Sequence, residues 1–557
     1  MKKWSKVIAL TVMVMLVVSF ALAGCGTPKK EESKEPAPQP KPQVLKMNWA
    51  EEPPALDPQV TTDQVSFEVL NNVMEGLVRI REGGKIEAGI AEKWDISPDG
   101  LKYTFHLRDA KWSDSSPVTA NDFDFAWRRA INPKTTSEYA YQLYYIKGAE
   151  KANSINIKDA DADKKIEDAM KNVGIKVVDP KTLEVTLETP TPYFLGLTAF
   201  GTYMPTKKEF FDKMGDKFAS EADKMLYNGP FVIKEWVHES KLNLAKNPNY
   251  WNAKAVKLDE IQGAMVKDTN AAVNMYEAGE LDIMGVTGDF IPNYKDKGMK
   301  TMPEATTWWV EYNLKDPFFK NLNIRKAFSL AIDRQAFVDN VLKNGSVVAT
   351  GFVPPLLNGL NDKFRKESGD YIPKTAQVDE AKKLLAAGMK ELGLTTAPKL
   401  KFLAGDSAPA KKYSQGLQEF WKKNLGIEVE LVNVNFKTRL QMMTKNDFSF
   451  VFAGWGADYD DPMTFMDLYV TGGTNQHSSF SNKEYDKLIE EAKKTNDQKV
   501  RMENMKKAEK ILMEQLPIAP LYHPAWNYVE KPYVKGVERF PLGADLLFLG
   551  ASVEGKK

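Results

Sequence analysis

Residues 400–431 read LKFLAGDSAPAKKYSQGLQEFWKKNLGIEVEL and contain one complete supersecondary unit. The apolar segment 400–403 predicts a strand, and an apolar stripe at helical spacing follows it and stops at Gly426. The stripe consists of Leu417, Phe420, Trp421 and Leu425. Residues 427–431 then alternate apolar and acidic side chains and predict a second strand. A strand–helix–strand unit favours a parallel pair of strands, so we expect an α/β protein.

Elements of both kinds are predicted on either side of this unit. Residues 103–108 (YTFHLR) and 183–188 (LEVTLE) alternate large or apolar side chains with polar ones and predict half-buried strands. Thr119 stands three positions before an acid and predicts the start of an aromatic helix. Asn323 is expected to cap a continuous helix over 324–342. The mixture supports α/β lobes along the whole chain.

The composition describes a globular protein without a dominant charge. Of the 557 residues 43% are hydrophobic and 27% are charged, and 76 Lys+Arg against 75 Asp+Glu give a net charge of +1. No global field therefore attracts nucleic acid. The chain exceeds the size at which one hydrophobic core keeps growing, so we expect two or three lobes.

The only cysteine, Cys25, ends an apolar leader. Lysines occupy positions 2, 3 and 6, and the apolar run 7–23 follows them, so residues 1–24 predict a secretion signal. Residues 22–25, LAGC, resemble the bacterial lipobox, which implies lipidation of Cys25 after cleavage. The alternative is a signal peptide cleaved nearby that leaves a free thiol.

Residues 26–43, GTPKKEESKEPAPQPKPQ, are rich in Pro, Lys and Glu and contain no large apolar side chain. They are expected to form an unstructured spacer, because they cannot bury enough apolar surface to offset chain entropy. Lipid anchor, spacer and body is the arrangement of a protein that works just outside a membrane.

Patterns that indicate catalysis or a cofactor are missing. The four histidines, His106, His238, His477 and His523, are far apart in sequence and show no zinc spacing. The chain has no Gly-x-Ser-x-Gly and no P-loop, and the run that starts at Gly454 lacks the third glycine of a dinucleotide fingerprint. With 12 Trp and 20 Tyr, the composition favours binding over chemistry.

A series of motifs between about residues 44 and 537 resembles the bacterial extracellular solute-binding proteins of family 5, the oligopeptide- and dipeptide-binding lipoproteins of ABC importers. The motifs, in order, are 52–58 EPPALDP, 74–77 MEGL, 90–94 IAEKW, 103–108 YTFHLR, 112–122 WSDSSPVTAND, 228–231 NGPF, 247–251 NPNYW, 278–282 AGELD, 324–327 IRKA, 331–334 AIDR and 454–459 GWGADY. Single pieces are weak, but so many in order make the resemblance strong.

The resemblance implies a periplasmic-binding-protein-like fold of type II, in which two jaws close on a ligand and an additional lobe is inserted. After the leader (1–24) and the lipidated cysteine with its spacer (25–43), the expected lobes are I at 44–75, 201–305 and 524–557, II at 76–200 and III at 306–523.

The resemblance also implies a site for an extended peptide. Asp458 of the GWGADY motif would neutralise the peptide's α-ammonium, because burying that charge unpaired is costly. Trp455 and Tyr459 would shield the ion pair from water. The alternative reading is that Asp458 caps a loop and Trp455 belongs to the core. Further candidates for side-chain pockets are Trp308, Trp309 and Phe436; the alternative for the Trp pair is one core and one surface side chain.

The chain departs from some members at informative positions. Where those members clamp the ligand carboxylate with an Arg and a His, this chain has Phe452 and Ala410, followed by Lys411 and Lys412 as partial substitutes. Where some carry a disulfide, it has Thr306 and Gly456. The sequence therefore predicts that no C-terminal clamp fixes peptide length, and that amidated peptides bind nearly as well as free acids.

The expected protein is a non-enzymatic, monomeric receptor, lipid-anchored on the extracytoplasmic face of the cell membrane. It would deliver oligopeptides to an ABC permease and its ATPase subunits, without metal, cofactor or nucleic acid. Within the same fold, dipeptides, cell-wall peptides, pheromones and a nickel chelate are alternative ligands. A secreted hydrolase using Asp458 and Asp460 is the alternative of another class.

Overall fold

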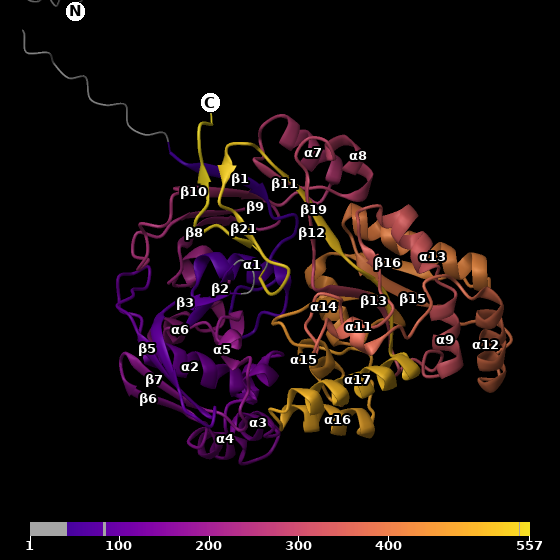
Figure 1. Ribbon diagram of the computed structural model, residues 1–557, viewed down its shortest axis with the longest axis horizontal. Helices are drawn as coiled ribbons and strands as arrows, with labels where there is room; N and C mark the ends of the chain where they lie inside the picture. Colours follow the sequence, from indigo (N-terminus) through magenta and orange to yellow (C-terminus); the bar gives the residue numbers. More distant parts are fainter. Residues whose placement is uncertain (1–41, 82–84, 545, 557) are drawn as a thin grey trace, which may run out of the picture. The chain divides into compact units, whose positions relative to one another are not determined.

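The computed structural model describes residues 42–81, 85–544 and 546–556 (Figure 1). The predicted leader, Cys25 and nearly all of the spacer lie outside these residues.

The first sheet joins the start of the described chain to a segment some 200 residues later. Its strands, in spatial order, are β1 (Val44–Asn48), β10 (Glu260–Ala264), β9 (Lys241–Lys246) and β8 (Phe231–Val237). β1 is parallel to β10, and the other pairs are antiparallel. A second sheet places β19 (Ala525–Glu530) between β11 (Ile283–Gly285) and β12 (Lys300–Pro303), and so returns the end of the chain to this region.

An antiparallel four-stranded sheet lies within the segment expected to be inserted. Its order is β4 (Ala91–Ile96), β5 (Lys102–Leu107), β7 (Thr182–Thr186) and β6 (Ile175–Asp179). β5 and β7 confirm the strands predicted at 103–108 and 183–188. Helix α2 (Ala120–Ile131) begins after Thr119 as predicted, and the Asp122 carboxylate accepts a hydrogen bond from the Thr119 N–H at 2.7 Å.

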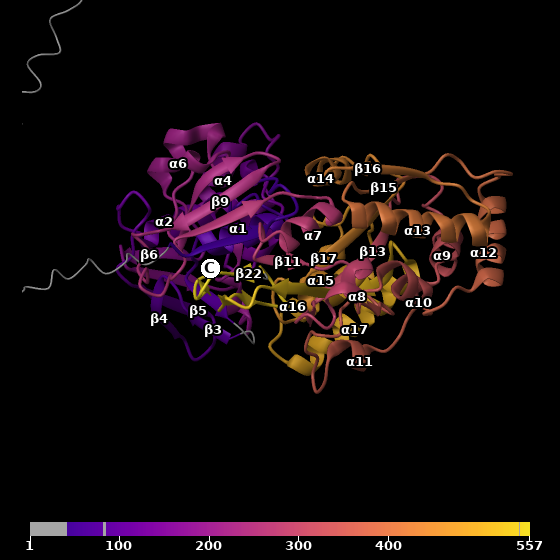
Figure 2. The same cartoon turned by 90° about the horizontal axis from the view of Figure 1, so that it is seen from above.

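The largest sheet has six strands. Their order is β14 (Val347–Val348), β18 (Ile518–His523), β13 (Thr306–Tyr312), β17 (Phe450–Gly456), β15 (Lys401–Gly405) and β16 (Glu430–Val434). Helix α13 (Ala408–Leu425) connects β15 to β16, which are parallel, and lies beside them in Figure 2. The predicted strand–helix–strand unit is therefore confirmed, although its second strand, β16, begins three residues later than predicted.

The prediction of one continuous helix over 324–342 is wrong. Helix α9 (Leu322–Leu330) begins earlier, because Asn321 rather than Asn323 caps it. The chain then restarts as α10 (Arg334–Ala336) and a π-helical turn, η8 (Phe337–Leu342). The break is marked by Asp333, whose carboxylate caps α10 by accepting a hydrogen bond from the Ala336 N–H at 2.8 Å. The buried guanidinium of Arg334 then donates to the Ser329 carbonyl in the last turn of α9 at 3.0 Å and to the distant Pro520 carbonyl at 2.7 Å.

The remaining elements are helices and short strand pairs. The further helices are α1 (Gln64–Val73), α3 (Ala149–Asn153), α4 (Ala162–Met170), α5 (Phe194–Leu197), α6 (Lys208–Met214), α7 (Thr269–Glu277), α8 (Ile291–Tyr294), α11 (Phe364–Ser368), α12 (Val378–Glu391), α14 (Phe436–Thr444), α15 (Met463–Met466), α16 (Lys483–Lys493) and α17 (Gln498–Gln515). Short two-stranded pairs join β2 (Val78–Arg81) to β3 (Lys85–Ala88), β20 (Val534–Lys535) to β23 (Ser552–Val553) and β21 (Glu538–Arg539) to β22 (Leu546–Leu547).

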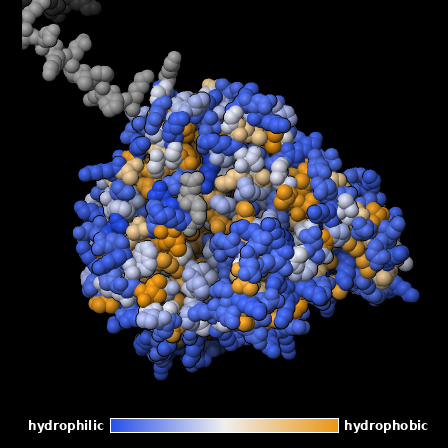
Figure 3. Space-filling model, in the orientation of Figure 1, coloured by the Kyte–Doolittle hydropathy of each residue, from blue (hydrophilic) through white to orange (hydrophobic). Residues whose placement is uncertain are grey.

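The sheets fall inside the lobe ranges expected from the sequence, while the boundaries of those lobes stay predictions. Among the described residues, no helix is long and apolar enough to cross a membrane. On the face shown in Figure 3, hydrophilic side chains predominate and hydrophobic ones form separate patches.

A close backbone approach in β10 provides a test of the packing. A Cβ at Gly263 would lie 1.9 Å from the Trp49 indole nitrogen and 2.6 Å from the Leu242 carbonyl oxygen. Gly263→Ala should therefore lower the free energy of unfolding by about 1–3 kcal/mol, measured by urea denaturation. The matched control is Gly285→Ala at the end of β11, where the nearest atom is 3.5 Å away. Equal stability of the two variants would contradict this packing.

Candidate functional site

Segments from distant parts of the sequence enclose a cavity of about 460 Å³. They are the start of α1, residues 138–139, β13, the 405–410 segment, α14, β17 with the residues after it, and residues 540–543. The volume lies within the range of about 300–1,000 Å³ that is usual for ligand sites.

One edge of strand β17 lacks a strand partner inside this cavity. β13 pairs with β17 along its whole length, whereas β15 pairs only with Phe450 and Val451. On that side, residues 452–456 have no partner strand among the described residues. The Phe452 carbonyl points there, since it accepts a hydrogen bond from Arg439 Nη1 at 3.2 Å.

Because backbone groups alternate along an antiparallel strand, Gly454 and Gly456 turn their N–H and C=O groups to the same side as Phe452. Both glycines line the cavity. The open edge can therefore add an extended chain by strand pairing.

Asp458 lies just beyond the open edge and lines the cavity. Its side chain is only 8% exposed, and it forms no ion pair with a described Lys or Arg. Gln142 Nε2 donates to Oδ2 at 2.9 Å, and the Tyr139 hydroxyl donates to Oδ1 at 3.4 Å. The Asp458 backbone N–H donates to Thr464 Oγ1 at 3.1 Å. The Thr464 hydroxyl also donates to Oδ2 at 3.5 Å. Burial raises the pKa of Asp458 to about 8, and the hydrogen bonds from Tyr139, Gln142 and Thr464 offset only part of that shift.

Tryptophans surround this carboxylate and the open edge. Trp455 stacks on Tyr139 at a ring distance of 5.7 Å, and its buried indole N–H has no hydrogen-bond partner among the described residues. Trp308 lies against Gly454, where a Cβ would be 2.7 Å from the indole. Gly454 is therefore required by its neighbour as well as by the open edge.

Five of the six candidate residues for a peptide site line the cavity, and one does not. Asp458, Trp455, Phe436, Trp308 and Trp309 all line the cavity. Trp309 is mostly core, since it is 3% exposed and packs edge-to-face on Phe352. Tyr459 does not line the cavity; its ring stacks on Tyr193 at 5.0 Å. The expected shielding of Asp458 by Tyr459 is therefore provided by Tyr139 and Trp455.

The charges that line the cavity are mostly acidic. The carboxylates are Glu51, Asp63, Glu138, Glu304, Glu311, Asp406 and Asp458, and Arg439 is the one Lys or Arg among the described lining residues. Burial raises the pKa of Glu311 to about 7 and lowers the pKa of His477 to about 4, so the histidine is neutral. A cationic group is thus favoured almost everywhere in the cavity.

The residues at the positions where some relatives clamp the ligand carboxylate, and the two lysines that follow, do not form such a clamp here. The Phe452 ring packs on Trp308 at 4.9 Å and does not line the cavity, whereas Ala410 does. Lys412 Nζ pairs with Asp289 at 2.6 Å, and neither it nor Lys411 lines the cavity, so the suggested substitution by these lysines is not what the structure shows.

The positions that carry a disulfide in some relatives are directly opposite each other in the β13–β17 ladder, where Thr306 pairs with Gly456. This register agrees with the alignment on which the Asp458 assignment depends.

The sequence analysis did not identify three residues that lie at or beside the cavity: Tyr139, Gln142 and Arg439. Tyr139 and the 3₁₀ helix η3 (Ala140–Leu143), which contains Gln142, belong to a segment some 320 residues before Asp458. Arg439 stands on α14 and looks like any surface cation in the sequence. No local pattern signals these contacts.

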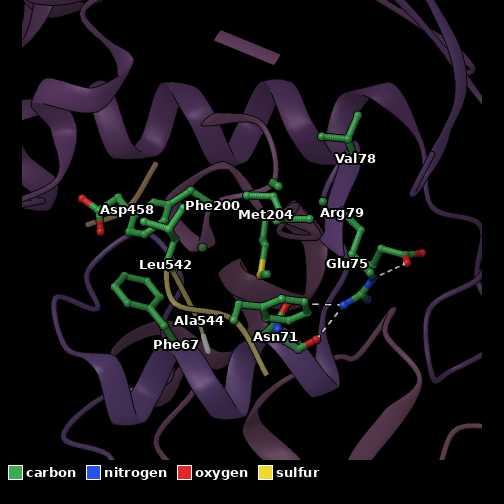
Figure 4. A pocket seen from close by; sticks show the side chains of 16 residues that line it. Phe67, Asn71, Glu75, Val78, Arg79, Phe200, Met204, Asp458, Leu542 and Ala544 are labelled. Atoms are coloured by element: carbon green, nitrogen blue, oxygen red, sulfur yellow. Dashed lines mark hydrogen bonds and ion pairs between the residues drawn. The ribbon is translucent and has the colours of Figure 1, made fainter. Parts of the chain in front are cut away.

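A smaller cavity of about 40 Å³ adjoins the first and shares Asp458 and Phe67 with it (Figure 4). Asp458 lies at one end, and Arg79, which pairs with Glu75 at 2.9 Å, lies at the other. The volume suits about one water molecule, so a ligand side chain does not fit there.

Comparison with known proteins identifies the class. The family model for bacterial extracellular solute-binding proteins, family 5, matches residues 85–477. The oligopeptide-binding protein OppA of Bacillus subtilis is 36% identical over 548 residues, which cover 96% of this chain and 97% of that protein. The chain belongs to this family, whose members are receptors for solutes rather than enzymes.

Solved structures agree. Listeria monocytogenes OppA bound to peptide has a TM-score of 0.85 and 37% identity, and the match covers 93% of this chain and 100% of that one. The murein tripeptide-binding protein MppA of Escherichia coli gives a TM-score of 0.81, whereas its unliganded open form gives 0.58; both are 29% identical and cover 92% of this chain and 98–99% of theirs. This chain is therefore described in a conformation unlike that open form.

The raised pKa of Asp458 has a consequence for stability. The folded pKa of about 8 exceeds the unfolded value of about 3.9, so the folded state binds more protons between these values and stability falls as the pH rises from 4 to 8. Asp458→Asn removes the charge, and the Gln142 Oε1 atom, which has no partner among the described residues, can accept from the new amide after a flip. The ligand-free variant should be more stable than the parent at pH 7 by up to about 4 kcal/mol in urea denaturation, because the folded pKa exceeds the unfolded value by about 4. This gain in the free energy of unfolding should vanish near pH 4. A gain that does not depend on pH would contradict the raised pKa of Asp458.

Proposed function

We propose that this protein is a receptor for oligopeptides, which it binds as extended chains along the open edge of β17 with the α-ammonium on Asp458. The observation that carries the proposal is the position of a buried carboxylate, without a described cationic partner, at the end of an unpaired strand edge within one cavity. An extended peptide with a free amino terminus satisfies both features.

This arrangement recognises what all peptides share. Main-chain hydrogen bonds to the edge provide affinity without reading side chains. The ammonium pairs with Asp458 in a site shielded by Tyr139 and Trp455, where an unpaired charge would be costly. The aromatic lining, which includes Trp308 and Phe436, offers apolar surface to varied side chains.

The proposed partners follow from the class. The receptor would hand its peptide to an ABC permease that is driven by separate ATPase subunits, and it would act as a monomer. The leader and the LAGC sequence at 22–25 support export and lipidation of Cys25, with the body held at the extracytoplasmic face of the cell membrane by the spacer.

The alternatives are weighed by the same geometry. The open edge spans residues 452–456, which suits a chain longer than a dipeptide; cell-wall peptides and pheromones share the peptide chemistry. The described residues contain no group of three or more His, Cys, Asp or Glu that could hold a metal ion. For a hydrolase, Asp460 would have to act with Asp458, but the Asp460 carboxylate binds the Asn358 N–H at 3.0 Å and does not line the cavity.

The first experiment tests retention against turnover. Pentaalanine added to the pure protein should bind in a 1:1 ratio in calorimetry and remain intact in mass spectrometry. N-acetylation of the peptide, or Asp458→Ala in the protein, should weaken binding by at least ~2 kcal/mol, because a desolvated charge loses its partner. Hydrolysis of the peptide would indicate an enzyme instead, and unchanged affinity would show that Asp458 is not the ammonium site.

The pH dependence provides a control on the same complex. Pairing with an ammonium favours ionised Asp458, so binding at pH 7 should release up to one proton and affinity should rise from pH 5 to 7. Above about pH 8 the α-ammonium itself deprotonates and affinity should fall. Calorimetry in buffers of different ionisation enthalpy measures the released proton, and Asp458→Asn should abolish its release.

The anchor is tested separately. Cys25→Ser should move the protein from the membrane fraction to the medium or soluble fraction of the producing bacterium, because one residue carries the proposed lipids. Peptide binding by the purified variant should be unchanged. Retention of the variant in the membrane would contradict lipidation at this position.

A further inference from the structure

Arg439 lines the cavity and forms no ion pair within 4.0 Å with any residue that the structure describes. It stands on α14, and its guanidinium lies over the Phe436 ring at 5.1 Å. Nη1 donates to the Phe452 carbonyl, whereas the buried Nε has no hydrogen-bond partner among the described residues. Burial lowers the pKa of Arg439 to about 10, which leaves the side chain cationic at neutral pH.

Glu51 is the acid whose charge acts on Arg439, and it partly offsets the effect of burial on the pKa of the arginine. Glu51 also lines the cavity, but it forms no ion pair within 4.0 Å of Arg439; its carboxylate lies 3.7 Å from Lys267 Nζ. Lys267 lies outside the cavity lining and also pairs with Glu239 at 3.3 Å. Arg439 therefore lines the cavity as a cation whose printed hydrogen bond is the one to the Phe452 carbonyl.

Arg439 and Asp458 mark the two ends of the open strand edge. Arg439 binds the carbonyl of Phe452, where the pairing with β15 has just ended, and Asp458 follows two residues after the last residue of β17. A peptide whose ammonium lies on Asp458 and whose chain runs antiparallel to β17 brings its other end to Arg439.

We propose that Arg439 binds the C-terminal carboxylate of the peptide, a role that rests on the proposed peptide-binding function. The sequence predicted no clamp because the positions used by some relatives hold Phe452 and Ala410; the structure supplies a cation from a different helix. A free carboxylate in a cavity lined by so many acids needs this cation, since no other described Lys or Arg lines it.

The separation of the two ends sets a preferred length. Phe452 and Asp458 are six positions apart, so the chain between them spans at most about 20 Å. An extended peptide covers about 3.3–3.6 Å per residue, and one of about five residues therefore reaches both ends. Shorter peptides reach only one charged group, and longer ones must bulge or leave the edge.

The experiment compares free acids with C-terminal amides. Alanine peptides of three to seven residues, each in both forms, are titrated by calorimetry into the full chain. Pentaalanine should bind about tenfold or more tightly as the free acid than as the amide, and this ratio should be largest near five residues. Arg439→Met should reduce the affinity for the free acid to that for the amide or below it, because the carboxylate then faces only the acids of the lining; retained binding of the amide shows that the variant is folded. Lys412→Met, a cation on α13 outside the cavity lining, is the matched control and should keep the preference.

Equal affinity for acid and amide in the parent protein would overturn the role of Arg439. So would a preference that survives Arg439→Met. If N-acetylation still weakens binding in either case, the peptide-binding function stands and only the carboxylate assignment fails. If no alanine peptide binds, both fail together.

Discussion

The chemistry of the cavity depends on one constraint, a buried carboxylate that has no cationic partner in the part of the chain that the structure describes. Three neutral donors, the hydroxyls of Tyr139 and Thr464 and the amide of Gln142, contact Asp458. They do not compensate for the loss of water, as the raised pKa shows. The protein therefore carries an electrostatic cost at this position, and a group that brings a positive charge removes it. Such a cost is typical of sites that are arranged for a ligand rather than for stability.

The open edge of β17 is the second feature that stability alone does not explain. An unpaired strand edge at a surface invites pairing with other chains. Here the edge lies inside a cavity, with Trp308 against Gly454 on one face of the strand and Trp455 on Tyr139 on the other. Only an extended chain that enters the cavity can reach it. A Cβ at Gly454 would lie 2.7 Å from the Trp308 indole and one at Gly456 would lie 3.2 Å from Thr306 Oγ1, so packing restricts the side chains at both glycines of the open edge.

Much of the fold could be predicted because its signals are local. The alternation in β5 and β7, the capping residues of α2 and the β15–α13–β16 unit all depend on neighbours within one element. The break between α9 and α10 was not predicted, although Asp333, which caps α10, is a local signal for it; the contact of Arg334 with Pro520 depends on tertiary structure. Asp458 was found by resemblance to a family. Gln142 and Arg439 were not, since what places them against β17 is the packing of segments that no spacing connects.

The two charged ends of the edge also give the site a polarity. An antiparallel strand edge accepts hydrogen bonds from a chain running in either direction, so pairing alone does not orient a ligand. With the amino end on Asp458 and the carboxyl end on Arg439, each terminal charge meets its opposite. Reversal would bring a carboxylate against a buried carboxylate and an ammonium against a guanidinium, and both contacts are repulsive in a medium of low dielectric. The charges at the two ends thus determine the direction of the bound peptide, while the strand edge between them can pair with a peptide of any sequence.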